Sequence, residues 1–302
     1  MNSTSLLRDR LRTVVAIPVT PFAADGRVDE ECYQSLVHLM VYGGITVLTP
    51  GGNTGEYYAL SPAERRRVVE LTVAAAPDAV VVAGVGLDLA TATADARAAV
   101  NAGADAVMVH QPLHPFRSLD GWVAYHGEIA RAVPDTGLLP YIKDPRVDAG
   151  AVFALAGACP QLVAVKYAVP EPISFAGLVD DTASLDLVWL CGLAEHWAPF
   201  FAVGGAAGFT SGLATVDPAR SLAMLDALHR ADQAAMLEQW RAIRRFEELR
   251  AAAGSQDNVS VVKEALAQRD LAPRSVRPPI SEVGPAVRKE VAEILSAWER
   301  QR

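Results

Sequence analysis

Short apolar runs alternate with longer helix-type segments along most of the 302-residue chain. Continuous apolar runs of this length are typical of parallel strands that are buried on both faces. The runs are Thr13–Val19, Ile45–Thr49, Ala79–Ala83, Asp105–Val109, Gly137–Tyr141, Leu162–Lys166, Leu185–Leu190 and Ala207–Ser211. Eight strand–helix units spaced by roughly 25–30 residues close a (β/α)8 TIM barrel, an α/β fold. A doubly wound sheet would need fewer strands.

The segments between the runs carry the start and stop signals of helices. Asp29 is a capping residue type, and the segment behind it reaches Tyr42, where Gly43–Gly44 predicts its end. Ser61–Glu64 combines a capping box with proline at the first helical position. The other expected helices are Thr91–Ala102, Asp120–Ala132, Ala149–Ala158, Ile173–Asp181, Ala194–Val203 and Asp217–Leu228.

The chain continues beyond the eighth strand–helix unit. Further helix-type segments follow at Gln233–Ala252, Val261–Ala267 and Ile280–Arg302. We therefore expect residues 1–230 to form the barrel and residues 231–302 to form a helical C-terminal extension packed against it.

Charge and cysteine usage limit the partners and the compartment. A net charge of −8 and a pI near 5.3 argue against nucleic acid or an anionic membrane as a partner. No apolar run reaches the about 18 residues of a membrane span, and Met1–Arg12 lacks the apolar core of a secretory signal. Cys32, Cys159 and Cys191 are widely spaced, which predicts reduced thiols in a cytoplasmic protein and no zinc site.

Lys166 is the most informative single residue, because it ends the apolar run that starts at Leu162. Burial at the end of such a strand disfavours the ammonium form, so the pKa falls and the amine becomes a nucleophile. Only four of the 27 basic residues are lysines, which makes a lysine at this position notable. The alternative is that the side chain snorkels out of the barrel to pair with an acid.

Barrel active sites lie at the C-terminal ends of the strands, and this rule selects a short set of candidates. The set is Gly51–Glu56, His110–Phe116, Tyr141–Arg146, Lys166, Gly192 and Thr210–Gly212. The glycine-rich loop offers backbone N–H groups for a carboxylate or a phosphate, although glycines there also suit a structural turn. Tyr141 is expected either to relay protons beside the lysine or to be a core tyrosine.

Two other chemistries are disfavoured. His110 and His114 are four residues apart, but Pro112 and Pro115 make the segment a loop and the His-Glu-x-x-His pattern is absent. No Gly-x-Ser-x-Gly elbow is present for hydrolysis by a serine nucleophile. We therefore expect amine-dependent carbonyl chemistry that needs neither a metal nor a cofactor.

Several motifs of the chain occur in an order and spacing that are typical of one enzyme family. They are Ala16–Phe22, Asp25–Gly26, Gly52–Glu56, Tyr141 and Val165–Tyr167. Together, from about residue 13 to Pro279, they resemble the dihydrodipicolinate synthase / N-acetylneuraminate lyase family. The resemblance implies a homotetrameric barrel in which Lys166 forms a Schiff base with a 2-keto acid such as pyruvate. It also implies that Tyr141 relays protons and that Thr54, with the backbone of Asn53 and Thr54, binds the keto-acid carboxylate.

The sequence departs from the synthase pattern in three places. Asn53 replaces the first threonine of the glycine-rich motif, and Leu113 and His114 replace a pair of tyrosines that includes an inter-subunit one. Arg146 keeps the position of the arginine that binds the second substrate's carboxylate, but Lys143 and Asp144 change the residues before it. His114 has either an acid–base role, for which imidazole titrates in a suitable range, or no role.

The run from Gly51 to Pro62 also resembles the 5-dehydro-4-deoxyglucarate dehydratases, which favours sugar-acid substrates. We therefore expect a Schiff-base lyase that acts on a 2-keto acid by aldol cleavage, condensation or dehydration. Its expected substrate contacts are Asn53, Thr54, His114, Arg146 and Thr210. The rivals are a non-catalytic barrel that binds a keto acid and a metal-dependent aldolase.

Overall fold

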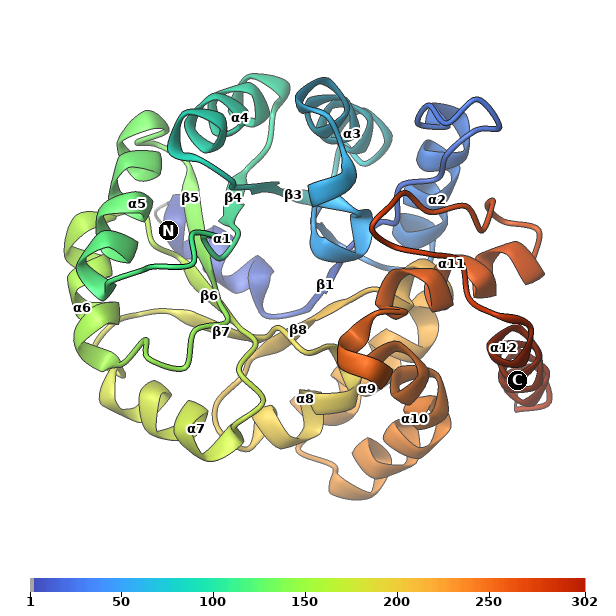
Figure 1. Ribbon diagram of the computed structural model, residues 1–302. Coiled ribbons are helices and arrows are strands. Elements are labelled where there is room, and N and C mark those ends of the chain that lie inside the picture. The colour runs from blue at the N-terminus through green and yellow to red at the C-terminus, as the bar shows by residue number, and fades with distance from the viewer. Residues whose placement is uncertain (1–2, 302) are drawn as a thin grey trace.

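The computed structural model describes residues 3–301 and contains a closed barrel of eight parallel strands in sequence order (Figure 1). The fold class expected from the sequence is thus confirmed. The strands are β1 (Val14–Ala16), β2 (Val47–Leu48), β3 (Val80–Val85), β4 (Ala106–Val109), β5 (Gly137–Ile142), β6 (Ala164–Tyr167), β7 (Val188–Cys191) and β8 (Gly208–Ser211). They are shorter than the apolar runs, because the ends of several runs belong to the connecting loops.

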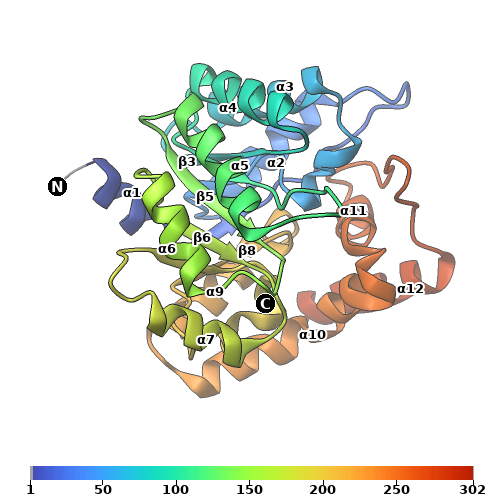
Figure 2. The same ribbon diagram turned by 60° about the vertical axis from the view of Figure 1, so that its left-hand side comes forward.

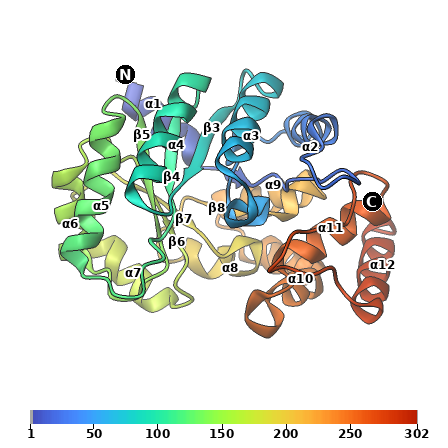
Figure 3. The same ribbon diagram turned by 45° about the horizontal axis from the view of Figure 1, so that its top comes forward.

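Helices surround the barrel, one after each strand (Figures 1 and 3). They are α2 (Glu30–Tyr42), α3 (Pro62–Ala75), α4 (Leu89–Ala102), α5 (Leu119–Ala132), α6 (Ala149–Ala158), α7 (Pro172–Asp181), α8 (Ala194–Ala202) and α9 (Pro218–His229). The predicted caps are confirmed. The Asp29 side chain accepts a hydrogen bond from the Cys32 amide, and Ser61 and Glu64 form a reciprocal capping box.

Two layers of apolar side chains hold the barrel together. Residues such as Val82, Met108 and Leu139 fill its interior, whereas Val107, Leu138 and their equivalents pack outward against the helices. Because successive side chains of a strand point to opposite faces, both layers need apolar residues. This is why the strands have continuous apolar sequences rather than alternating ones.

The sequence did not predict α1 (Ser3–Leu11), which closes the N-terminal end of the barrel. Leu11 is fully buried in the cluster that fills the barrel interior, and Leu7 packs against that cluster. Figure 2 shows α1 on the opposite side of the barrel from the C-terminal helices. Because only two leucines face the barrel in this short, arginine-rich helix, its apolar signal is too weak to stand out in the sequence.

The C-terminal region is helical and packs beside α8, α9 and the loop after β2 (Figures 2 and 3). It contains α10 (Gln233–Ser255), α11 (Asn258–Gln268) and α12 (Pro285–Glu299). Non-helical backbone angles at Ala252–Gly254 interrupt α10 close to its expected end. The last helix begins at Pro285 rather than at Ile280, with Pro285 in its first turn. Within residues 3–301, no helix is long and apolar enough to cross a membrane.

A buried ion pair joins the C-terminal region to the glycine-rich loop. The Lys263 ammonium on α11 donates to Glu56 Oε1 and, at 2.7 Å, to the Ser275 carbonyl oxygen, while the Arg277 amide donates to Glu56 Oε2 at 3.0 Å. Both side chains of the pair are completely buried. Desolvation lowers the pKa of Lys263, and the Glu56 carboxylate opposes that shift.

We predict that Lys263→Met alone destabilises the protein by about 3–5 kcal/mol, because it leaves the Glu56 carboxylate buried without its cation. The double variant Glu56→Gln/Lys263→Met should recover much of this loss, because neither charge remains. Urea unfolding measures both effects, with the exposed Lys289→Met as the control. If the free energy of unfolding of Lys263→Met lies within about 1 kcal/mol of the wild-type value, this account is wrong, because effects of that size are typical of ion pairs at the surface.

Candidate active site

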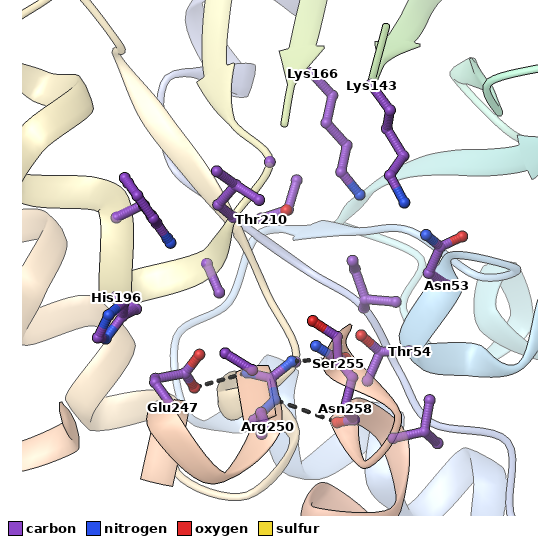
Figure 4. Close-up of a pocket in the computed structure, with 18 of the residues that line it drawn as sticks. Asn53, Thr54, Lys143, Lys166, His196, Thr210, Glu247, Arg250, Ser255 and Asn258 are labelled. Carbon is purple, nitrogen blue, oxygen red and sulfur yellow. Dashed lines mark hydrogen bonds and ion pairs between the residues drawn. The ribbon is translucent and has the colours of Figure 1, made fainter. Parts of the chain in front are cut away.

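A cavity of about 400 Å³ lies at the C-terminal ends of the strands (Figure 4). The barrel and the C-terminal region both contribute polar side chains to its wall. From the barrel and its loops come Asn53, Thr54, Tyr141, Lys143, Lys166, His196 and Thr210. From α10, α11 and the segment between them come Glu247, Arg250, Ser255 and Asn258.

Lys166 lies on β6 opposite Tyr141 of β5 and is only 2% exposed. Burial, assisted by the positive charge of Lys143, lowers the pKa of Lys166 from 10.5 to about 7. Among the ion pairs of residues 3–301 none involves this amine, so the snorkelling alternative does not hold. A large share of the Lys166 side chains therefore carries a neutral, nucleophilic amine near pH 7.

Tyr141 lies directly beside the lysine, with its ring centroid 4.0 Å from Lys166 Nζ. Burial raises the pKa of its phenol, and the Asn53 side chain opposes this shift. The phenol therefore stays protonated at neutral pH. Both side chains line the same cavity, and a protonated hydroxyl is a group that can donate a proton and take one back.

Lys143 follows Tyr141 by two residues, and its amine lies beside that of Lys166 (Figure 4). Its Nζ is 5.9 Å from the centroid of the Tyr141 ring. Unlike Lys166, Lys143 is exposed. Two adjacent ammonium groups repel each other, and this repulsion favours the neutral form of the more buried amine. Two of the four lysines of the chain thus meet in one cavity.

The glycine-rich loop after β2 and the end of β8 form another part of the wall. Asn53 and Thr54 lie in a short 3-10 helix, Asn53–Gly55, and the Thr54 side chain is buried. Asn53 Oδ1 is buried and has no hydrogen-bond partner within the described part of the chain. Thr210 is buried on β8. The structure therefore brings these three predicted contact residues together with Lys166 and Tyr141.

Arg146 and His114 do not line this cavity. Arg146 is 56% exposed and binds Asp144 through two nitrogens, at 3.0 and 2.6 Å. The hydrogen bonds from Arg146 are the main reason why the pKa of Asp144 is lowered to about 2. The exposed His114 lies within 2.8 Å of the Phe116 carbonyl oxygen, in its own loop. This cavity therefore gives no support to the expected substrate contacts of Arg146 and His114, which stay predictions.

His110 is buried and contacts other parts of the barrel wall. Its Nε2 is 2.8 Å from the Gly51 carbonyl oxygen, and its ring stacks on Tyr57 at 4.2 Å. Burial lowers its pKa to about 3, so the ring is neutral at physiological pH. Throughout residues 3–301, no group of three or more His, Cys, Asp or Glu side chains is arranged to hold a metal ion.

The sequence analysis missed the side chains that the C-terminal region contributes. Glu247 and Arg250 are one helical turn apart on α10, and their side chains bond at 2.7 Å within the cavity wall. In the sequence this spacing looks the same as that of an exposed ion pair, such as Glu128 with Arg131. Only the packing of α10 against α8 turns the pair towards the barrel.

A closed barrel with a buried, low-pKa lysine at a strand end defines the class of barrel lyases that work through an amine. Comparison with known proteins gives the particular family. The model of the dihydrodipicolinate synthetase family matches residues 10–298, and the chain belongs to this family. The expectation of a lyase-type enzyme of this family is confirmed.

Relatives with two different names cover nearly the whole chain. The 4-hydroxy-tetrahydrodipicolinate synthase of Sorangium cellulosum is 32% identical over 94% of this chain and 95% of its own length. A probable 5-dehydro-4-deoxyglucarate dehydratase of Rhizobium rhizogenes is 27% identical over 93% of this chain and 94% of its own. Among solved structures, the dihydrodipicolinate synthase of Bacillus clausii has a TM-score of 0.93 at 40% identity, covering 97% of this chain and 99% of that one.

We predict that Lys143→Met moves the midpoint of Lys166 reactivity, near pH 7 in wild type, upward by about one pH unit or less. The amine reacts in its neutral form, so reactivity rises with pH through this midpoint, and loss of a neighbouring cation raises the pKa. Borohydride trapping of a pyruvate adduct at a series of pH values measures the midpoint.

Lys143→Arg keeps the charge and should leave the midpoint unchanged, as should the exposed Lys289→Met. The midpoint of Lys143→Met should remain well below 10.5, because burial contributes most to the shift. The same midpoint in Lys143→Met and wild type would show that Lys143 has no influence on the amine.

Proposed function

We propose that this protein is a Schiff-base lyase for a polar, extended 2-keto acid, with Lys166 as the nucleophile. The observation that carries the proposal is the buried Lys166 amine, whose pKa lies near 7 beside the protonated Tyr141. A binding protein would gain nothing from a neutral primary amine at this position. A lyase needs one, because the amine must attack a carbonyl carbon.

The proposed reaction begins when Lys166 Nζ attacks C2 of the keto acid. The carbonyl oxygen takes up protons and leaves as water, which produces a protonated imine. The imine withdraws electrons from C3, so that either the C3–C4 bond breaks or a C3 proton and the C4 hydroxyl group are lost. Tyr141, whose ring centroid lies 4.0 Å from Lys166 Nζ, is proposed to carry protons to and from these atoms, and water finally hydrolyses the imine.

The carboxylate next to the keto group is proposed to bind the glycine-rich loop. Thr54 contributes a hydroxyl, and the amides of Asn53 and Thr54 lie at the start of a 3-10 helix, where backbone N–H groups lack helical partners. Thr210 lies across the same cavity and is proposed to contact the substrate as well. The Lys143 charge further attracts an anionic substrate.

The site favours a sugar-acid type of substrate over the short aldehyde acid of a synthase. Arg146, which the resemblance assigns to the second substrate of the synthases, is bound to Asp144 and outside the cavity. The cavity volume of about 400 Å³ exceeds the need of a three-carbon keto acid, and its far wall carries hydroxyl, amide and charged groups. The relatives named as dehydratases support this choice.

Assembly into a homotetramer in the cytoplasm is part of the same proposal. Leu113 and Phe116 are exposed apolar side chains in the loop where the resemblance places an inter-subunit residue. Cys32, Cys159 and Cys191 are all free thiols, which is the usual state in a reducing compartment.

We predict that Lys166→Ala abolishes turnover and adduct formation while the protein stays folded, because it removes the only proposed nucleophile. Intact mass after borohydride treatment with pyruvate, and separately with keto-deoxy sugar acids, detects the reduced adduct. The exposed Lys289→Ala is the matched control and should form the adduct normally. An adduct that persists in Lys166→Ala, or its absence from wild type with every keto acid, would refute the proposal.

Tyr141→Phe should slow turnover by about 10²–10⁴-fold, the usual effect of losing an acid–base group. The phenylalanine keeps the ring beside the lysine, so trapping of the imine at long times should still reach completion. Steady-state turnover combined with end-point trapping separates the two effects. Turnover close to the wild-type rate would exclude Tyr141 from the proton relay.

A further inference from the structure

Arg250 is a buried cation in the cavity wall that the proposed reaction does not use. It lies on α10, and its side chain is only 4% exposed. Its Nε donates to the Asn258 carbonyl oxygen at 3.3 Å, and its terminal nitrogens donate to Glu247 Oε1 at 2.7 Å and to Asn258 Oδ1 at 3.3 Å. A guanidinium has five N–H donors, so these three bonds leave one donor on each terminal nitrogen.

The fold makes room for this guanidinium at Gly212, just after β8. A Cβ atom at that position would lie 2.7 Å from an Arg250 terminal nitrogen and 2.9 Å from Thr54 Cγ2. Glycine therefore allows Arg250 to reach the cavity beside Thr54. In Figure 4, Arg250 and Asn258 lie on the side of the cavity away from Lys166 and Lys143.

The backbone next to Arg250 is held in an unusual conformation. Ala253, Gly254 and Ser255 all have positive φ angles, of 48°, 71° and 66°. Such angles are unfavourable for alanine and serine and are found where a local arrangement must be maintained. The turn that they form ends α10 and places Ser255 and Asn258 in the cavity wall beside Arg250.

The charges of the cavity are not balanced. Lys143 and Arg250 are cationic and Glu247 is the only carboxylate in the wall, so one net positive charge remains when Lys166 is neutral. A protonated imine on Lys166 would add a second. The carboxylate next to the keto group would neutralise one of these charges, and a second carboxylate would neutralise the other.

We propose that Arg250, together with Asn258 and Ser255, forms a subsite for the second carboxylate of a dicarboxylic 2-keto acid. The inference rests on the proposed function and narrows its substrate to diacids. The carboxylate next to the keto group stays at Asn53 and Thr54, near Lys166, and the distal carboxylate accepts from the two remaining Arg250 donors. Planar, two-point binding of this kind is the geometry that arginine provides.

The test compares two probes of equal chain length, 2-oxoadipate and 2-oxohexanoate, which differ in having a carboxylate or a methyl group at the far end. The measured quantity is the concentration of each that gives half-maximal borohydride-trapped adduct on Lys166. Wild type should need roughly 10- to 100-fold less of the dicarboxylate, the scale of a charge-assisted hydrogen bond.

Arg250→Met should lose this preference while trapping 2-oxohexanoate and pyruvate as wild type does, and Arg250→Lys should restore part of it. If Arg250→Met fails to fold, Arg250→Gln takes its place, because its amide can still donate to Glu247 but carries no positive charge. An equal loss for both probes, or no preference in wild type, overturns the subsite. Failure of wild type to trap even pyruvate would instead overturn the proposed function.

Discussion

The proposed chemistry depends on the burial of one primary amine in the wall of a closed barrel. Moving the pKa of Lys166 from 10.5 to about 7 corresponds to about 4 kcal/mol of lost stability at pH 7, and this loss disappears only above the unfolded-state pKa. The folded barrel tolerates it because its strands are apolar on both faces and bonded to neighbours on both sides. The proposed nucleophilic role of Lys166 and its destabilising effect thus have the same origin, which is desolvation.

The C-terminal region completes the environment of this amine. Its α11 reaches the glycine-rich loop through the buried Lys263–Glu56 pair, and its α10 brings Arg250 and Glu247 into the cavity. The glycine-rich loop, which we propose binds the substrate carboxylate, is thereby fixed from behind. The helical region thus has two roles, because it supports the binding loop and lines the far wall.

Much of the site followed from a simple rule, which is that functional side chains gather at the C-terminal ends of barrel strands. Lys166, Tyr141 and Thr210 lie on strands, so their positions were fixed once the strands were recognised. Arg146 lies in a loop, where a neighbouring carboxylate decides its direction, and Asp144 turns it away from the cavity. The spacing of residues along the chain does not show whether such an arginine binds a neighbouring carboxylate or points into the cavity.

The sequence by itself determined the barrel, the order of its elements and the strand-end residues, because apolar periodicity and helix caps are local signals. Only the tertiary structure decided that α1 closes the barrel, that Lys143 lies beside Lys166 and that Arg250 enters the cavity. Each of these depends on contacts between segments far apart in the chain. The low pKa of Lys166 depends on both the sequence and the tertiary structure. The apolar strand predicts that the amine is buried, and the folded barrel brings the cation of Lys143 beside it.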